Sequence, residues 1–272
     1  MTPIFALAIA LAMPAMSLAA ALAKPAAAFT KPSFGLNGRD DSIVGGTTAS
    51  SGEFPYIVSL SHSSSHFCGG VLINAYTVAT AAHCSVSYSA SSVKVRAGTL
   101  TWASGGTQVG VSSITVHPSY SSSTINNDVA LWHLSTAIAT STTIGYATLP
   151  VQGSDPVADT TTTVAGWGLL TENGSTLPAT LRKVSVPVVS RATCRAEYGT
   201  SAVTDNMFCA GLAAGGKDSC SGDSGGPIID ASTGVLIGLV SWGQGCAEAG
   251  YAGVYSRIGN YVTWINTNKW TS

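Results

Sequence analysis

The sequence predicts an all-β fold, arranged as barrels or as a sandwich, and two observations support this prediction. First, the polar residues are mainly Ser and Thr interleaved with Val, Ile and Gly, a mixture that favours short strands and turns over amphipathic helices. Second, from Ile43 onward the chain reads as short alternating segments separated by turns, with little helical periodicity. Many short strands with few helices are typical of β-barrels and β-sandwiches.

The individual elements follow from these patterns. Two helices are expected: one over 191–198, for which Ser190 is a suitable N-cap, and a terminal one in which Ile258, Val262 and Ile265 share a face. The segments that alternate as strands do are 56–60, 71–73, 93–97, 130–134, 183–189 and 235–241.

Length and charge limit the class of protein. A chain of 272 residues can bury a sizeable core, and mostly-β folds often use such a length as one unit. The formal net charge is -1 and only 9% of residues are charged. Without a basic stripe to neutralise phosphates, nucleic acid is not expected as a partner.

Residues 1–23 have the pattern of a secretory signal peptide. An apolar run ends in Ala21-Leu22-Ala23, which fits a small-residue cleavage site. The alternative is a membrane anchor, because about 20 apolar residues can span a bilayer. Pro14 and Ser17 interrupt the run, which favours the signal peptide and hence a secreted protein with no membrane association after its removal.

The segment 24–42 contains Pro and Gly without sustained periodicity, which indicates a removable propeptide. The folded domain is therefore expected over 43–272.

Six cysteines follow the signal peptide, and no pair has C-x-x-C spacing. An even number behind a secretory signal predicts three disulfides in an oxidising compartment. The sequence alone permits about 15 pairings of the six. The cysteines are Cys68, Cys84, Cys194, Cys209, Cys220 and Cys246.

The pentapeptide GDSGG at 222–226 is a candidate nucleophile site. Flanking glycines allow a sharp turn that exposes the Ser224 hydroxyl, and they leave backbone N–H groups free to receive a developing oxyanion. The same residues match G-x-S-x-G, the nucleophile elbow of lipases and esterases, whose histidine follows the serine. All five histidines of this chain precede Ser224, so the elbow interpretation lacks a base.

A serine nucleophile needs a base, and the base needs an orienting acid. His83 is a candidate base, since small residues before it leave its ring accessible and Cys84 can tether the loop. Asp128 is a candidate acid just before a strongly apolar strand. In such a buried setting its charge would interact strongly with neighbouring groups. Each residue alone is more often structural than catalytic.

Six motifs in order resemble the chymotrypsin–trypsin family of serine proteases over residues 43–272. Each could occur by chance, but all six in this order are highly specific. The motifs are IVGG at 43–46, AAHC at 81–84, DVAL at 128–131, GWG at 166–168, DSGGP at 223–227 and SWG at 241–243.

The resemblance implies a mechanism. Ser224 would attack the scissile carbonyl, His83 would take and return the proton, and Asp128 would orient the histidine. The N–H groups of Gly222 and Ser224 would form the oxyanion hole. The resemblance also implies two packed six-stranded antiparallel β-barrels with a C-terminal helix, and a boundary between the two barrel subdomains near 150–160.

The family's disulfides carry over to the pairs Cys68–Cys84, Cys194–Cys209 and Cys220–Cys246. The first pair would hold the His83 loop, and the last would brace the wall of the specificity pocket.

Specificity for Arg or Lys is implied by Asp218, which aligns with the aspartate at the base of the trypsin pocket. A buried carboxylate selects a cation because it is otherwise left unpaired. Ser219 and Tyr255 also agree with the trypsin pattern. The other residues assigned to substrate binding are Ser241, Trp242, Gly243 and Gly253.

Activation in this family follows cleavage before the IVGG segment, after which the freed Ile43 amine would pair with Asp223. In this chain Asp40, Asp41 and Ser42 precede Ile43, and the nearest basic residue is Arg39. A trypsin-like enzyme would cut after Arg39 and leave three residues on the amine. We therefore expect a separate activating protease as a partner.

No cofactor and no metal are expected. Some trypsins hold Ca²⁺ on carboxylates between the histidine and the aspartate, but this chain has no Asp or Glu between Glu53 and Asp128. His62 and His66 lack the convergence and the third ligand of a zinc site. Asn173-Gly174-Ser175 is a sequon, and the sequence is equally consistent with glycosylation and with a plain turn there.

The expected substrates are proteins or peptides, and the enzyme is expected to be a monomer. The alternative from another class is a protease-fold binding protein without catalysis. Such a protein usually lacks a triad member or an intact oxyanion loop, and every such position here is occupied appropriately.

Overall fold

The computed structural model describes residues 43–272, so the expected signal peptide (1–23) and propeptide (24–42) lie outside the described residues. None of the helices within 43–272 has the length and apolarity needed to cross a membrane.

The elements of the first half are β1 (Thr47–Thr48), β2 (Ile57–His62), β3 (Ser65–Leu72), β4 (Thr77–Thr80), η1 (Ala90–Ser92), β5 (Val93–Ala97), β6 (Thr107–Val116) and β7 (Ala130–Leu134). Those of the second half are β8 (Thr161–Gly166), β9 (Arg182–Val189), α1 (Arg191–Tyr198), β10 (Met207–Ala210), β11 (Pro227–Asp230), β12 (Leu236–Trp242), β13 (Gly253–Arg257), η2 (Ile258–Asn260) and α2 (Val262–Asn268).

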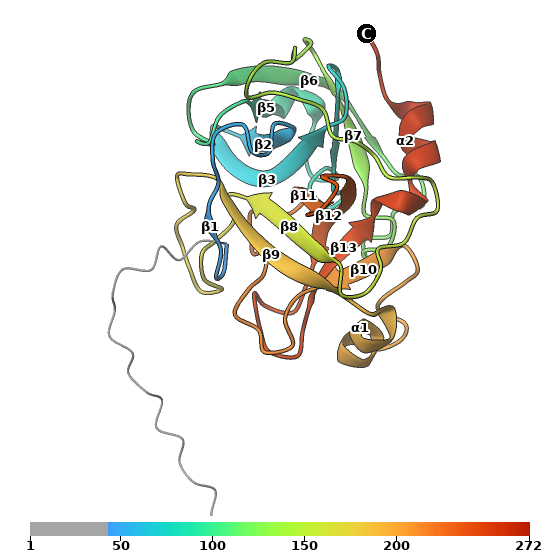
Figure 1. Cartoon of the computed structure of the whole chain (residues 1–272). Helices are drawn as coiled ribbons and strands as arrows, with labels where there is room; N and C mark the ends of the chain where they lie inside the picture. The colour runs from blue at the N-terminus through green and yellow to red at the C-terminus, as the bar shows by residue number, and fades with distance from the viewer. Residues whose placement is uncertain (1–42) are drawn as a thin grey trace, which may run out of the picture. The chain divides into compact units, whose positions relative to one another are not determined.

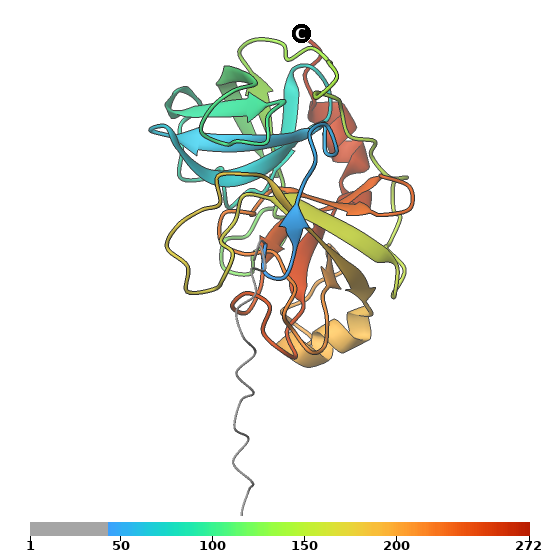
Figure 2. The ribbon, with the colours of Figure 1, turned by 60° about the vertical axis from the view of Figure 1, so that its left-hand side comes forward.

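Two six-stranded antiparallel barrels make up this fold, as predicted (Figures 1 and 2). The first closes in the order β2-β3-β4-β7-β6-β5. The second follows the order β9-β10-β13-β12-β11-β8 and closes because β8 pairs back onto β9. The short β1 adds to the β9 edge. The connection 135–160, which contains the expected subdomain boundary, links the last strand of one barrel to the first strand of the other.

Alternating side chains determine which face of each strand enters a core. In β5 the side chains of Val93, Val95 and Ala97 are buried, while Lys94 and Arg96 point away from the core. This period of two residues is the one that a half-buried strand requires.

Both predicted helices are present. The Ser190 hydroxyl oxygen accepts a hydrogen bond of 3.1 Å from the Thr193 N–H and so caps α1. Helix α2 follows the last strand of the second barrel, yet its Ile265 belongs to the hydrophobic core that contains the first barrel's residues. The Trp270 ring then stacks on His133 of β7 at 4.7 Å. The C-terminal segment therefore ties the two barrels together.

Strand β3 begins six residues before the predicted segment at 71–73, because its two glycines look like strand breakers in the sequence. A Cβ atom at Gly69 would lie 2.9 Å from the Cα atom of Gly226. Glycine is therefore present for the close approach of β3 to the turn that carries Ser224. The strands β1, β4, β6, β8, β10, β11 and β13 were also not predicted. Ser, Thr and Gly blur the alternation of β6, β8 and β13, and the other four strands are only two to four residues long.

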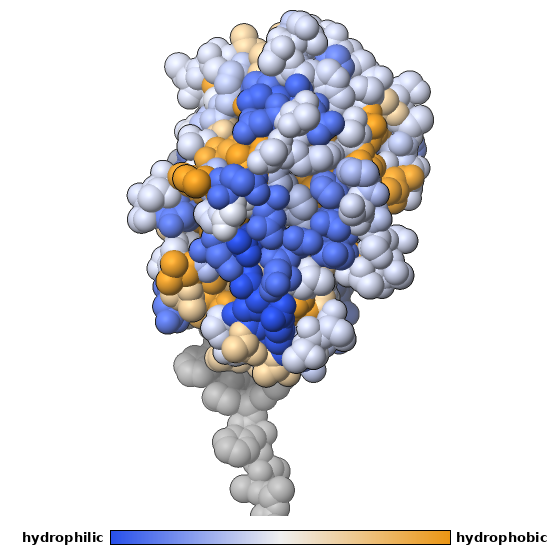
Figure 3. Space-filling view, turned by 90° about the vertical axis from the view of Figure 1, so that its right-hand side faces the viewer, coloured by the Kyte–Doolittle hydropathy of each residue, from blue (hydrophilic) through white to orange (hydrophobic). Residues whose placement is uncertain are grey.

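One face of the protein is shown in Figure 3. Hydrophilic residues form a broad band down its middle, and apolar residues occupy small separate patches beside that band. On this face the described residues show no extended apolar area.

Candidate active site

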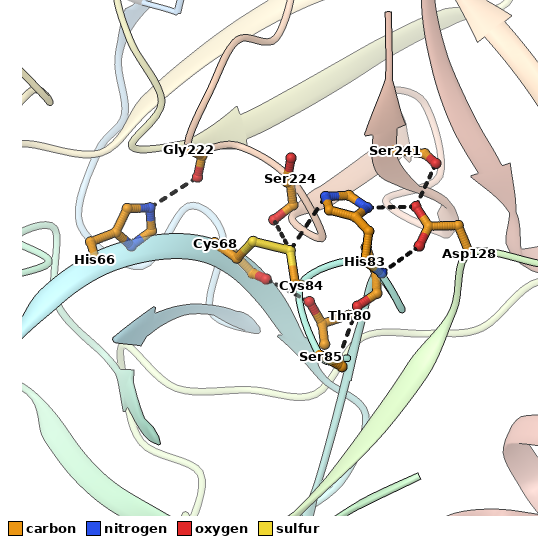
Figure 4. Close-up of a disulfide and its surroundings, with 12 residues drawn as sticks. His66, Cys68, Thr80, His83, Cys84, Ser85, Asp128, Gly222, Ser224 and Ser241 are labelled. Atoms are coloured by element: carbon orange, nitrogen blue, oxygen red, sulfur yellow. Dashed lines mark hydrogen bonds and ion pairs between the residues drawn. A yellow bond between two sulfur atoms is a disulfide. The ribbon is translucent and has the colours of Figure 1, made fainter. Parts of the chain in front are cut away.

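Three predicted residues meet where the two barrels face each other. His83 follows β4, Asp128 precedes β7, and Ser224 precedes β11 of the other barrel. Figure 4 shows the His83 ring between the Asp128 carboxylate and Ser224. The fold thus brings together residues that are 45 and 96 positions apart in the chain.

Asp128 fixes the orientation of His83 through two contacts. The His83 N–H donates to Asp128 Oδ1 at 2.8 Å, and the ring atom Nδ1 lies 2.8 Å from Asp128 Oδ2. The carboxylate is an acceptor, so the Nδ1 atom carries the proton in this pair. The opposite ring atom, Nε2, is then free to act as a base toward Ser224.

The second barrel holds the acid as well. Ser241 of β12 donates its hydroxyl to Asp128 Oδ2 at 2.6 Å, and Ser256 of β13 donates to the Asp128 carbonyl at 2.7 Å. Asp128 is only 1% exposed. A buried carboxylate needs hydrogen-bond donors, and here His83 of the first barrel and Ser241 of the second supply them.

The glycines around Ser224 are required by the backbone. Gly222 has φ 101° and Gly225 has φ 73°, values that side-chain-bearing residues rarely adopt. A Cβ atom at Gly225 would lie 2.1 Å from the Thr80 hydroxyl oxygen. Within residues 43–272, the N–H groups of Gly222 and Ser224 donate to no backbone carbonyl. They are available for an oxyanion.

Three disulfides are present, and two of them border the site. The Cys84 sulfur lies 3.6 Å from both the His83 Nε2 atom and the Ser224 carbonyl oxygen (Figure 4). Cys68, His83 and Cys84 are close enough together to suggest a metal cluster, but the two sulfurs are joined to each other and so are not free to act as thiolate ligands. The pairs are Cys68–Cys84, Cys194–Cys209 and Cys220–Cys246.

A pocket beside Ser224 contains every residue assigned to substrate binding. Asp218 is 5% exposed, and its carboxylate accepts bonds from the Ser219 N–H at 2.8 Å and the Ala247 N–H at 3.1 Å. Burial raises the pKa of Asp218 to about 6, although these bonds oppose the rise. Among residues 43–272, no Lys or Arg forms an ion pair with it. The assigned residues that line the pocket are Asp218, Ser219, Ser241, Trp242, Gly243 and Gly253.

Two glycines keep this pocket open. A Cβ atom at Gly253 would lie 2.6 Å from Asp218 Oδ1 and 3.0 Å from the Tyr255 hydroxyl. At Gly243, which lines the pocket, a Cβ atom would meet its nearest neighbours at 3.9 Å, an ordinary van der Waals contact. Any side chain at either position would therefore take up room in the pocket.

The sequence did not identify Tyr198, the last residue of α1, which braces both pocket walls. Its hydroxyl donates to the Ala252 carbonyl at 2.7 Å and accepts from the Gln244 N–H at 3.2 Å. These two residues adjoin the wall glycines Gly253 and Gly243. Nothing in the local sequence signals this role, because the contacts span about 50 residues.

His66 has a structural role that the sequence did not identify either. Its Nε2 donates to the Gly222 carbonyl at 2.9 Å, and its Nδ1 accepts from the Ser59 hydroxyl at 2.8 Å. Burial lowers the pKa of His66 to about 4, so the ring is neutral at pH 7. His66 thus holds the turn that precedes Ser224.

Ile43 and Asp223 are both completely buried. Ile43 lies in a core cluster of the second barrel. Asp223 accepts from the Gly168 N–H at 2.7 Å and the Cys220 N–H at 2.9 Å, and burial raises its pKa to about 7. No ion pair to Asp223 occurs among the described residues.

Comparisons with known proteins agree with this geometry. The family model for Trypsin matches residues 43–265. Trypsin Blo t 3 of Blomia tropicalis is 52% identical over 227 residues, covering 82% of this chain and 84% of the relative. Trypsin delta of Drosophila erecta is 43% identical (84% and 89% covered), and trypsin alpha of Drosophila melanogaster is 42% identical (83% and 87% covered). The chain therefore belongs to the trypsin family of serine endopeptidases.

Proposed function

We propose that this chain is a secreted endopeptidase, made as an inactive precursor, that hydrolyses peptide bonds on the carboxyl side of Arg or Lys. Membership of the trypsin family supports catalysis over the alternative of an inactive binding protein. The substrates are proteins or peptides, and the mature enzyme acts as a monomer without a cofactor.

Ser224 is the nucleophile in this proposal. His83 accepts its proton through Nε2, since Nδ1 is committed to Asp128, and returns the proton to the leaving amine. The N–H groups of Gly222 and Ser224 bind the oxyanion. Ser224→Ala should abolish reaction with a covalent serine-protease inhibitor. A normal burst of product from this variant would refute the assignment.

The observation that carries the specificity is the buried Asp218 carboxylate at the pocket. It has backbone donors but no cationic partner among residues 43–272, so a substrate guanidinium or ammonium would supply the missing charge. Gly243 and Gly253 leave room for a long side chain to reach it.

Parallel assays of Arg, Lys, Phe and Val amide substrates test this specificity. Wild-type enzyme should cleave only the Arg and Lys substrates efficiently, and Asp218→Ser should lose both activities while still reacting with a small, uncharged serine reagent. Equal rates of the variant and the wild type on the arginyl amide would contradict the proposal. Failure of the wild-type enzyme to react with the small serine reagent would instead contradict the proposal that this chain is catalytic.

The precursor is activated by cleavage before Ile43. The freed amine pairs with Asp223, whose buried charge otherwise has no cation among the described residues. Acetylation of this amine should therefore lower activity at neutral pH, and full activity of the acetylated enzyme would exclude the pairing.

A separate protease makes this cut, because the bond follows Ser42 and not a basic residue. Purified precursor incubated alone should not acquire an N-terminus at Ile43. Its appearance in wild type, with none in a parallel Ser224→Ala sample, would show that the enzyme activates itself.

Secretion is supported by the signal-like residues 1–23 and by three disulfides, which persist in oxidising compartments. Expression in a secretory host should release protein that begins after Ala23. Retention of 1–23 on a membrane-bound product would favour an anchor.

A further inference from the structure

The loop before Asp128 contains a backbone conformation that Ile125 does not favour. Ile125 has φ 51° and Asn127 has φ 55°, both in the left-handed region. That region is costly for a β-branched residue such as Ile, so surrounding contacts must hold the loop.

Asn206 supplies such contacts from the second barrel. It lies just before β10, and its side-chain amide donates to Asn127 Oδ1 at 3.0 Å and to Asn126 Oδ1 at 3.3 Å. Its own side-chain oxygen accepts from Asn260 Nδ2 at 2.9 Å. The Thr204 hydroxyl also donates to Asn126 Oδ1, at 2.8 Å. Asn206 is therefore the centre of a side-chain network that crosses between the barrels.

The network ends next to the acid of the site. Asn127 is bonded to Asp128 through the chain, and the Val129 N–H donates to the Asn127 carbonyl at 2.8 Å. Asn127 also donates through Nδ2 to the Ser119 carbonyl at 2.8 Å, which completes its anchoring within the first barrel. A shift of Asn127 would thus move the backbone of Asp128 relative to His83.

We propose that Asn206 is a positioning residue for catalysis: by binding Asn126 and Asn127 it holds the strained loop that sets Asp128 against His83. The inference rests on the proposed role of Asp128. Asn206 touches neither substrate nor the reacting atoms, and it acts through the loop. The same bonds join the second barrel to the residue that precedes Asp128.

Asn206→Asp tests this because it preserves size and the acceptor for Asn260 but removes both N–H donors. We expect kcat on an arginyl amide to fall about 10- to 100-fold, as small misplacements of a catalytic group do. KM should stay within about threefold, since the pocket at Asp218 is formed by other segments. The NMR resonance of the His83 Nδ1 proton, moved far downfield by its bond to Asp128, should shift or broaden.

A matched control is Asn74→Asp. Asn74 also uses its amide in a bond between distant segments, to the Trp270 carbonyl at 2.8 Å, but it does not contact the loop. This variant adds the same charge and should keep kcat and the His83 resonance, whatever it does to the melting temperature. Equal kcat in the two variants would overturn the inference, as would an unchanged His83 resonance in Asn206→Asp.

Asn127→Gly provides a second route if Asn206→Asp does not fold. Glycine accepts the left-handed backbone but lacks the side chain that Asn206 binds. The kcat should fall similarly in Asn127→Gly and in Asn206→Ala. The double variant of these two substitutions should lose no more kcat than about the larger of the two single losses. Additive losses would overturn the inference. Failure of the wild type to react with a covalent serine inhibitor would overturn the proposed function instead.

Discussion

The Ser241 hydroxyl donates a hydrogen bond of 2.6 Å to the same Oδ2 atom of Asp128 that His83 Nδ1 contacts at 2.8 Å. Ser241 belongs to β12 of the second barrel, and it also lines the pocket that contains Asp218. One residue therefore connects the proposed catalytic acid with the wall of the proposed specificity pocket.

Replacing Ser241 by Ala should lower kcat by about tenfold, the typical effect of removing one hydrogen bond to a charged group. The pocket walls stay in place, so KM for an arginyl amide should change less. Steady-state kinetics measure both values. A kcat within about twofold of wild type would mean that the bond does not support Asp128.

The affinity of the pocket for a cation should depend on pH. Burial raises the pKa of Asp218 to about 6, and a cation binds only the ionised carboxylate. For an aromatic amidine, which stays cationic throughout, the association constant should be level above pH 6 and fall about tenfold per unit below it. Calorimetric titration measures this. Asp218→Asn should bind weakly at every pH, and a pH-independent affinity in wild type would contradict the assignment.

Stability should also decline as the pH falls from about 6.5 to about 4, through His66. Its folded-state pKa of about 4 lies below the ordinary value, so in this window the unfolded chain takes up a proton that the folded chain does not. The loss is at most about 3 kcal/mol.

The measurement is urea unfolding at several pH values in a Ser224→Ala background, which excludes self-digestion. The raised pKa values of Asp218 and Asp223 act in the opposite direction, so the difference between wild-type His66 and His66→Gln isolates the histidine. Parallel pH curves for the two proteins would disprove the effect.

Gly253→Ala should impair cleavage after Arg and Lys, since the added methyl would lie 2.6 Å from Asp218 Oδ1. We expect kcat/KM to fall at least about tenfold, because the buried carboxylate would lose its pairing geometry. Gly110→Ala is the matched control, as its Cβ atom would meet only the Ser135 side chain. Similar activity of the two variants would argue against a filled pocket.

Removal of metal ions should leave the protein unchanged. The chain has no carboxylate side chain between Glu53 and Asp128. Within this stretch the loop 98–106 is held by protein contacts: Arg96 donates to the Gly105 carbonyl at 2.5 Å, and Thr99 donates to the Ser104 carbonyl at 3.2 Å. A chelator should therefore shift the melting temperature by less than about 2 °C. A larger fall that Ca²⁺ reverses would reveal a calcium site.

Short motifs made much of the site predictable from the sequence. The pentapeptide around Ser224, the small residues before His83 and the apolar strand after Asp128 are local patterns with a chemical reason. The order of the histidines along the chain also excluded the lipase arrangement, and this exclusion requires only the sequence. The second strand of the first barrel, β3, was only partly predicted, since Gly69 looks like a strand breaker until Gly226 lies against it.

The sequence by itself determined the fold class, the chemical types of the site residues and their order along the chain. Only the tertiary structure decided which side chains support them: Tyr198 at the pocket walls, His66 at the turn before Ser224, and Asn206 beside the loop of Asp128. These contacts join residues between about 50 and 160 positions apart, and no local pattern encodes such pairs. Closure of the second barrel brings Tyr198 to the pocket walls, whereas the packing of one barrel on the other brings His66 to Gly222 and Asn206 to Asn127. The bonds form because buried polar groups need hydrogen-bond partners.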